Sequence, residues 1–153
     1  MKIEFLDDIS NDGQFKDVVS DKLVRLFDFD SVEAGKFQET IKNLIESKNS
    51  IAVDRLSFIK RINCSLTLSV DNDDLGIIQT GREEFECRLT KDSYKEMISL
   101  IQPFVDHESN GYQWLYDNMA DIDFLFSPVT PKFPRSTFRQ HRSLHRSLHN
   151  TCE

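Results

Sequence analysis

Apolar residues recur at helical spacing in the first third of the chain. Between Gln14 and Phe27 they are separated by steps of three and four, and similar spacing returns after Ser31, a suitable helix N-cap. The short segment Met1–Leu6 can form a strand. We therefore expect a short strand followed by N-terminal helices. Their apolar stripes are Phe15, Val18, Val19, Leu23, Leu26 and Phe27 in the first, and Phe37, Ile41, Leu44 and Ile45 in the second.

The spacing changes to every second residue in the middle of the chain. Apolar and polar residues alternate over 64–70 and again over 84–89, and Leu75–Thr80 can form a strand between them. Such alternation is typical of strands with one buried face. We expect a three-stranded antiparallel meander whose far face is polar and open to solvent or to a partner. The preceding residues 51–62 fit no single period.

A helix and a strand are expected after the meander. Thr90 or Ser93 can cap the helix, and Pro103 lies at its end. The aromatic segment Tyr112–Tyr116 fits either a helix or a strand, whereas alternation over Ile122–Phe126 predicts a closing strand. The pattern as a whole predicts an α+β fold with N-terminal helices, a central antiparallel β-meander, one further helix and a closing strand.

Charge divides the chain into two parts. The formal net charge is −7, and the last 23 residues, 131–153, carry +4, which leaves −11 for residues 1–130. We expect residues 1–130 to form a single acidic domain and residues 131–153 to form a flexible basic tail. The acidic domain repels nucleic-acid phosphates and anionic membranes, so the expected partner is a basic protein.

Histidines are concentrated in the tail. His141, His145 and His149 would share one face of a helix, a spacing that can bind zinc or nickel adventitiously. No further ligand is placed nearby apart from Cys152. We therefore expect no cofactor.

The cysteines and the apolar runs indicate the compartment. Cys64, Cys87 and Cys152 form no CxxC pair, and Cys64 and Cys87 fall on the apolar faces of expected strands, where they would be core thiols. The first residues contain no apolar run typical of a signal peptide, and no run is long enough for a membrane span. A cytoplasmic protein is expected.

Acidic residues cluster between positions 71 and 86. A calcium loop beginning at Asp71 would place Leu75 and Arg82 where oxygen ligands are required, so an EF-hand is not favoured. Two interpretations remain open. The cluster is either a charged sheet rim that prevents edge pairing or a docking surface for a basic partner. The residues concerned are Asp71, Asp73, Asp74, Glu83, Glu84 and Glu86.

Three large aromatic residues lie close together after a glycine. Tyr112, Trp114 and Tyr116 can form a packing cluster or can anchor an interface, since each combines a large apolar area with a polar tip. Their acidic neighbours argue against a nucleic-acid platform, which needs cations. They are candidate partner-binding residues beside the acidic cluster.

Catalytic groups are sparse. His107 is the one histidine of residues 1–130, it lies in a polar loop, and no glycine-rich phosphate loop occurs. We expect no enzyme and no catalytic residues. Two alternatives are a small metal-dependent hydrolase, in which Asp121 and Asp123 join acids from the meander, and a non-catalytic regulatory adaptor that uses residues 131–153.

The first 130 residues resemble the small immunity proteins of bacterial polymorphic and contact-dependent toxin systems. The features that suggest this are the acidic α+β composition, the clusters Asp71–Asp74 and Glu83–Glu84, and the aromatic block GYQWLYDNMADIDFLFSP, residues Gly111–Pro128. Such proteins share no single fold, so no binding residues are carried over. The resemblance implies stoichiometric binding to a cognate toxin, often a basic nuclease, without catalysis.

Overall fold

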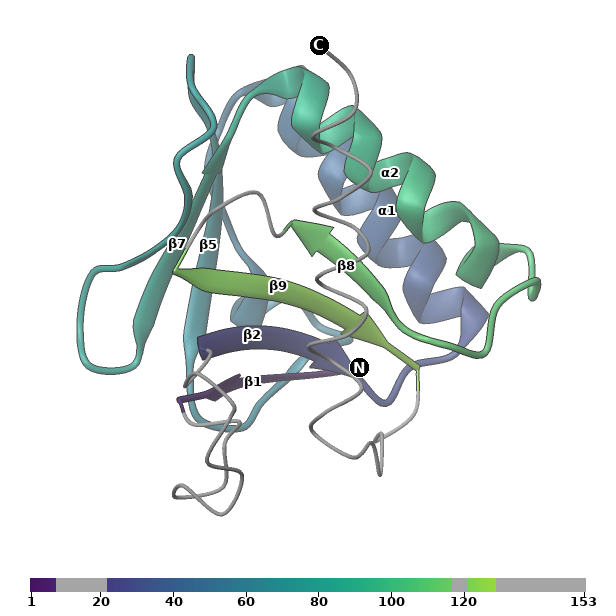
Figure 1. Ribbon diagram of the computed structural model, residues 1–153. Coiled ribbons are helices and arrows are strands. Elements are labelled where there is room, and N and C mark those ends of the chain that lie inside the picture. Colours follow the sequence, from purple (N-terminus) through teal and green to yellow (C-terminus); the bar gives the residue numbers. More distant parts are fainter. Residues whose placement is uncertain (8–21, 117–120, 129–153) are drawn as a thin grey trace, which may run out of the picture.

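The computed structural model describes residues 1–7, 22–116 and 121–128, and these residues form two α-helices and two mixed β-sheets (Figure 1). We call the sheets A and B. Sheet A has the strand order β4-β1-β2-β9-β8, with β1 Lys2–Leu6, β2 Lys22–Phe27, β4 Lys60–Arg61, β8 Gln113–Tyr116 and β9 Ile122–Ser127. Sheet B has the order β3-β5-β7-β6, with β3 Ile51–Ala52, β5 Ser65–Val70, β6 Gly76–Gln79 and β7 Glu84–Leu89. A short 3-10 helix, η1 Val53–Arg55, follows β3.

Helix α1 spans Ser31–Ser47, as the spacing of its apolar residues predicts, but its N-cap is Asp30 rather than Ser31. The Asp30 carboxylate accepts a hydrogen bond from the Glu33 amide at 2.8 Å, and the Glu33 carboxylate accepts one from the Asp30 amide at 3.3 Å. This reciprocal pair satisfies two amides of the first turn. At the other end, Lys48 adopts a left-handed conformation and stops the helix.

Helix α2 spans Lys91–Val105 and lies beside α1 (Figure 1). Thr90 is its N-cap and accepts a hydrogen bond from the Ser93 amide at 3.3 Å. Pro103 lies in the last turn, so the expected end of the helix is confirmed to within two residues.

The first predicted helix is wrong where the structure describes it. Residues 22–27 form β2, a strand between β1 and β9, and residues 14–21 lie outside the described residues. Val24 and Leu26 face the main core, while Leu23 packs on the opposite face of sheet A. Because both faces of this strand contain apolar residues, its sequence lacks the alternation of a half-exposed strand.

The predicted antiparallel meander is also wrong. β5 and β7 are parallel neighbours, with Ser65 beside Glu84 and Val70 beside Leu89, and β6 pairs antiparallel with the other side of β7. Strand β7 therefore lies between the two strands that precede it in the sequence. Alternation indicates which face of a sheet a residue occupies, but it does not specify the neighbouring strand.

The connection from β5 to β6 crosses the end of β7. The Asp71 amide donates a hydrogen bond to the Leu89 carbonyl, and the Leu75 amide donates one to the Arg88 carbonyl, both at 2.9 Å. These bonds fix residues 71–75 against the strand that they cross. The expected turn after Val70 is thus present, but it joins strands that are not neighbours.

The remaining strands agree better with expectation. Met1–Leu6 contains β1, and the closing strand is β9, which pairs parallel with β2 and antiparallel with β8. The ambiguous aromatic segment forms β8, at one edge of sheet A. The observed fold class is α+β. The main departures are β2, which takes part of the place of the first expected helix, and the parallel pairing of β5 with β7.

One main apolar core joins both sheets and both helices. Its buried members include Ile3, Val24, Leu26, Phe124 and Phe126 from sheet A; Leu66, Leu68, Phe85, Cys87 and Leu89 from sheet B; and Phe37, Ile41, Leu44, Tyr94, Met97 and Ile101 from the helices. Burial of such side chains is the dominant favourable term in folding. The core therefore fixes the position of sheet B, whose other face carries the polar residues.

Neither helix of the described ranges is long and apolar enough to cross a membrane. The expected basic tail, residues 131–153, lies outside the described residues.

Candidate functional site

The outer face of sheet B is polar. Along β5 the outward residues are Ser65, Thr67 and Ser69, and the parallel register places them beside Glu84, Glu86 and Arg88 of β7. The residues between them point into the main core. The predicted polar face is thus confirmed, although it is built from a parallel strand pair.

A groove of about 590 Å³ runs over this face. Hydroxyl groups of Ser65 and Thr67 line it together with Glu84 and Glu86 of β7. The segment between α1 and β5 supplies the remaining charged lining residues, Asp54, Arg55 and Arg61. The groove therefore offers carboxylates, guanidinium groups and hydroxyls to a partner, with little apolar surface.

Glu86 is the carboxylate most firmly held in the groove. It accepts hydrogen bonds from Arg88 at 2.8 Å and from the Ser69 hydroxyl at 3.2 Å. The hydrogen bond from Arg88 lowers the pKa of Glu86, and partial burial raises it. The hydrogen bond has the larger effect, so the pKa of Glu86 lies below its ordinary value. Glu86 is therefore ionised at neutral pH and already paired.

Glu83 and Glu84 lie at the start of β7. Glu83 pairs with Arg61 at 3.2 Å, and both side chains are exposed, so the pair contributes little to stability. Glu84 is exposed and makes no hydrogen bond or ion pair through its carboxylate with any described residue. It is thus open to an incoming cation.

Asp71 and Asp74 organise the connection between β5 and β6. The Asp71 carboxylate accepts a hydrogen bond from the Asn72 amide at 2.6 Å, which closes a local turn. Asp74 accepts hydrogen bonds from the Thr90 amide at 2.7 Å and the Ser93 hydroxyl at 2.6 Å, at the start of α2. Both carboxylates have structural roles that the sequence does not reveal.

Asp73 differs from its two acidic neighbours in that connection. Its side chain is exposed and has no hydrogen bond or ion pair to any residue that the structure describes. It therefore resembles Glu84 in being available to a partner.

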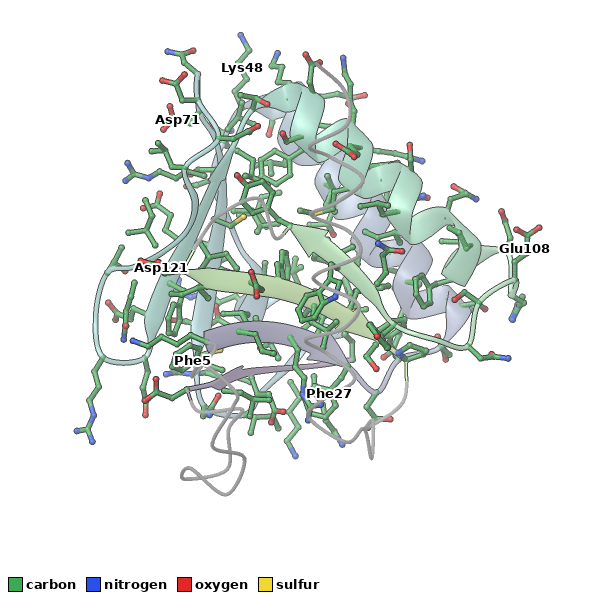
Figure 2. All side chains as sticks on the ribbon, in the orientation of Figure 1. Phe5, Phe27, Lys48, Asp71, Glu108 and Asp121 are labelled. Carbon is green, nitrogen blue, oxygen red and sulfur yellow. The ribbon has the colours of Figure 1, made fainter. Side chains whose placement is uncertain are left out.

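The predicted acidic cluster is divided between the two ends of sheet B. Glu84 is the first residue of β7, whereas Asp71 lies beside Leu89, its last residue. Five residue steps of about 3.3 Å separate these ends by roughly 17 Å. Asp71 is labelled at the end of the sheet nearest Lys48 (Figure 2). Apart from Glu86, which lies within the groove, the carboxylates thus border the outer face at both ends instead of forming one patch.

Two of the candidate aromatic residues, Trp114 and Tyr116, belong to β8 of sheet A, and Tyr112 precedes that strand. Trp114 is 2% exposed and packs with Leu23 and Leu125, and its ring meets that of Tyr112 edge to face at 6.3 Å. Tyr112 and Tyr116 are half-buried. The burial of Trp114 agrees with the packing interpretation of this cluster, and Trp114 and Tyr116 lie on a different sheet from the acidic residues.

The structure separates the residues of the hydrolase alternative. Asp123 is 2% exposed within β9 of sheet A and Asp121 precedes that strand, whereas the acids of residues 71–86 belong to sheet B. Among residues 1–7, 22–116 and 121–128, no group of three or more His, Cys, Asp or Glu side chains is arranged to hold a metal ion. His107 lies in the loop after α2 with a positive φ of 58°.

The two described cysteines are buried core thiols, as the alternation predicts. Burial raises the pKa of Cys64 and that of Cys87 to about 12. Both are therefore protonated and unreactive at neutral pH.

No family model matches the chain, and no curated protein is significantly similar to it.

Proposed function

We propose that the protein is a binding inhibitor of the immunity-protein type, which neutralises a basic bacterial toxin domain through the outer face of sheet B. The observation that carries this proposal is the open groove on that face, which is lined by the carboxylate of Glu84, unpaired among the described residues. A second such carboxylate, that of Asp73, lies in the connection at the other end of the sheet. Exposed fixed charges of one sign attract a partner of the opposite sign and raise the association rate.

The formal charge, −7 for the whole chain, supports the same kind of partner. Residues 1–130 carry −11 of this balance, so this part of the chain attracts a basic domain. The cytoplasm is the proposed site of action because the free, buried thiols of Cys64 and Cys87 suit a reducing compartment.

The proposal is tested by affinity purification from native lysate at low and high salt, followed by measurement of the purified complex. We expect one basic protein, bound one-to-one and released by salt, whose toxicity in cells is suppressed by co-expression. Absence of any basic partner at both salt concentrations refutes the proposal.

A matched pair of double variants locates the binding face. The double variant Asp73→Lys, Glu84→Lys reverses the charge at the two unpaired carboxylates of sheet B and its connection. The control Glu46→Lys, Glu96→Lys makes the same change in net charge on the exposed surfaces of the helices. We expect the first pair to weaken the complex by roughly tenfold or more and the second to weaken it much less. Equal weakening would show that net charge, and not this face, determines binding.

A further inference from the structure

Sheet A carries apolar residues on both of its faces. One set points into the main core, and the residues that alternate with it along β2 and β9 point the other way. On this second face, which we call the outer face of sheet A, Leu23, Trp114 and Leu125 form a cluster flanked by Leu6 and Tyr112. A sheet with apolar residues on both faces requires a covering layer on each.

The outer face of sheet A is buried, although no described element covers it. Leu23, Trp114 and Leu125 are each at most 2% exposed, and Asp123 and Ser127, which share this face by register, are buried as well. Both helices and sheet B pack on the opposite face. No described helix or strand lies in front of β2 and β9 (Figure 1). A second layer is therefore needed from outside the described residues.

The C-terminal segment, residues 131–153, has the sequence pattern of a covering helix. Leu144, Leu148 and Cys152 recur at every fourth residue. The arginines recur at steps of four and three, at Arg135, Arg139, Arg142 and Arg146. On a helix these two sets occupy different sides, so the segment would be amphipathic.

The length and position of this segment suit the outer face of sheet A. A helix over residues 138–152 would be about 22 Å long. Strand β9 extends over roughly 20 Å, so such a helix would span the face. The segment also follows β9 directly in the sequence, and β9 is the strand that contributes Leu125 to the cluster.

Charge favours this segment over residues 8–21, which join β1 to β2. The two cations of the outer face are each paired with a carboxylate, in the pairs Lys2–Asp28 and Arg25–Glu4. With Asp123 included, the formal charges of this group sum to −1. Residues 131–153 carry +4, whereas residues 8–21 carry four aspartates against one lysine. The C-terminal segment is therefore the complementary one.

We propose that residues 131–153 fold back as an amphipathic helix onto the outer face of sheet A. Leu144 and Leu148 pack on the cluster around Trp114, and the arginines flank it. The segment is then an ordered layer of the domain, unlike the flexible tail expected from its charge. This inference goes beyond the proposed function and does not depend on it, because the binding groove belongs to sheet B.

A nitroxide attached within the segment locates it in the full-length protein. Ser143→Cys with Cys152→Ser provides a single reactive thiol, because Cys64 and Cys87 are buried and their pKa values are raised to about 12. On the proposed helix, position 143 lies away from the apolar side, so the label does not disturb the contact.

The label should broaden the amide signals of the face that it covers. We expect broadening at Leu23, Trp114 and Leu125 to exceed that at Thr67 and Glu86 on sheet B by roughly threefold or more. Broadening centred on sheet B would overturn the inference, since the basic segment would then lie on the acidic groove. Absence of broadening anywhere would overturn it as well.

A matched pair of double variants tests whether apolar contacts hold the segment. Leu144→Glu, Leu148→Glu places charge on the apolar side, whereas Ser147→Glu, Asn150→Glu makes the same change in net charge on the other side. We expect the leucine variant to increase acrylamide quenching of Trp114 fluorescence by roughly threefold or more and to lose the broadening, while the amide signals of sheet B stay in place. The control should retain the quenching and broadening of the original chain.

Equal quenching in the two variants would overturn the inference, because another segment, such as residues 8–21, would then cover Trp114. If the leucine variant does not fold, the nitroxide in the otherwise unchanged segment decides. Nitroxide-labelled protein is also mixed with isotope-labelled protein that carries no nitroxide. Broadening in that mixture would overturn the inference, since the segment would lie on a second copy. All these measurements use the protein alone, so their failure leaves the proposed function untouched.

Discussion

At the scale of single residues, the carboxylates of sheet B differ in how firmly the fold holds them. Asp74 and Glu86 each accept two hydrogen bonds, whereas Asp73 and Glu84 accept none from described residues through their side chains. Carboxylates that carry the same charge in the sequence therefore have two different roles in the folded protein. The held carboxylates stabilise the sheet and α2, and the open ones are available for binding.

Replacing Asp74 should destabilise the fold. Asp74→Ala removes the acceptor of the Thr90 amide and the Ser93 hydroxyl at the start of α2, so we expect the free energy of unfolding to fall by about 1 kcal/mol, as for the loss of a helix cap. Urea denaturation measures the change. Asp73→Ala, which breaks no side-chain contact with a described residue, should alter stability by less than about 0.5 kcal/mol.

The same carboxylate should make stability depend on pH. Burial raises the pKa of Asp74, but the hydrogen bonds from Ser93 and Thr90 outweigh it and hold that pKa below its ordinary value. A lowered folded-state pKa stabilises the protein above the unfolded-state pKa, and this contribution is lost as the pH falls through the folded-state value. Asp74→Asn should therefore lower stability at neutral pH and flatten its decline in acid. An unchanged acid profile in this variant would contradict the prediction.

The buried thiols permit a chemical test. In a Cys152→Ser variant, we expect no incorporation of a thiol reagent into the native protein at mildly alkaline pH, because the pKa values of Cys64 and Cys87 are both raised to about 12. Mass spectrometry after denaturation should show both thiols labelled. Labelling of either thiol in the native state at the rate of a small-molecule thiol would show that sheet B is less closed than described.

At the scale of elements, Tyr94 joins α2 to both parallel strands of sheet B. Its buried hydroxyl group donates a hydrogen bond that is shared between two carbonyl oxygens, that of Cys87 at 2.8 Å and that of Ser69 at 3.1 Å. Burial raises the pKa of Tyr94 far above its ordinary value, so it does not ionise in the folded protein. The helix and the two strands are therefore coupled through one side chain.

Tyr94→Phe should lower the free energy of unfolding by about 1–2 kcal/mol, because buried carbonyls lose a donor. Thermal and urea denaturation provide the measurement. Ser99→Ala, which removes an exposed hydroxyl from the same helix, is the control and should change stability little. If Tyr94→Phe lowers the free energy of unfolding no more than Ser99→Ala does, water replaces the hydroxyl as the donor to the two carbonyls.

The sequence predicted elements well where one face of the element is exposed. Helix α1, helix α2 and the outward residues of β5 and β7 follow from their periods. The sequence did not predict strand β2, because Leu23 on one face and Val24 and Leu26 on the other leave no alternation of apolar and polar residues. The sequence did not predict the parallel pairing of β5 with β7 either. The spacing of apolar residues indicates which face of a sheet each residue occupies, but it does not indicate which strands are neighbours.

The candidate site was predictable only in part, for similar reasons. The exposure of Asp73 and Glu84 follows from their place in a turn and on an outward strand position. The structural role of Asp74 depends on Ser93, nineteen positions away, and no local signal indicates that contact. Arg55 and Arg61 line the groove from a segment that has no clear period.

At the scale of the whole molecule, β9 links two apolar clusters. Phe124 and Phe126 face the main core, while Leu125 packs with Leu23 and Trp114 on the other face of sheet A. Adjacent residues of one strand thus contribute to both clusters. Loss of that strand would disrupt both at once.

The single tryptophan can report on this coupling. We expect urea unfolding followed by Trp114 fluorescence to coincide with unfolding followed by far-UV circular dichroism, because both clusters share β9. The native emission should be blue-shifted, since the indole is buried. Two separated midpoints would indicate that sheet A and the main core unfold independently.

The position of β7 between β5 and β6 also has a consequence for how the chain reaches its native state. During synthesis β5 and β6 emerge first, and the short connection between them would allow an ordinary hairpin to form. In the native sheet that hairpin must be absent, because β7 occupies the space between the two strands. Residues 71–74, held across the end of β7, thus bear on folding kinetics as well as on binding. The hydrogen bond from the Asp71 amide to Leu89, and those that Asp74 accepts from Thr90 and Ser93, can form only after the third strand has entered the sheet.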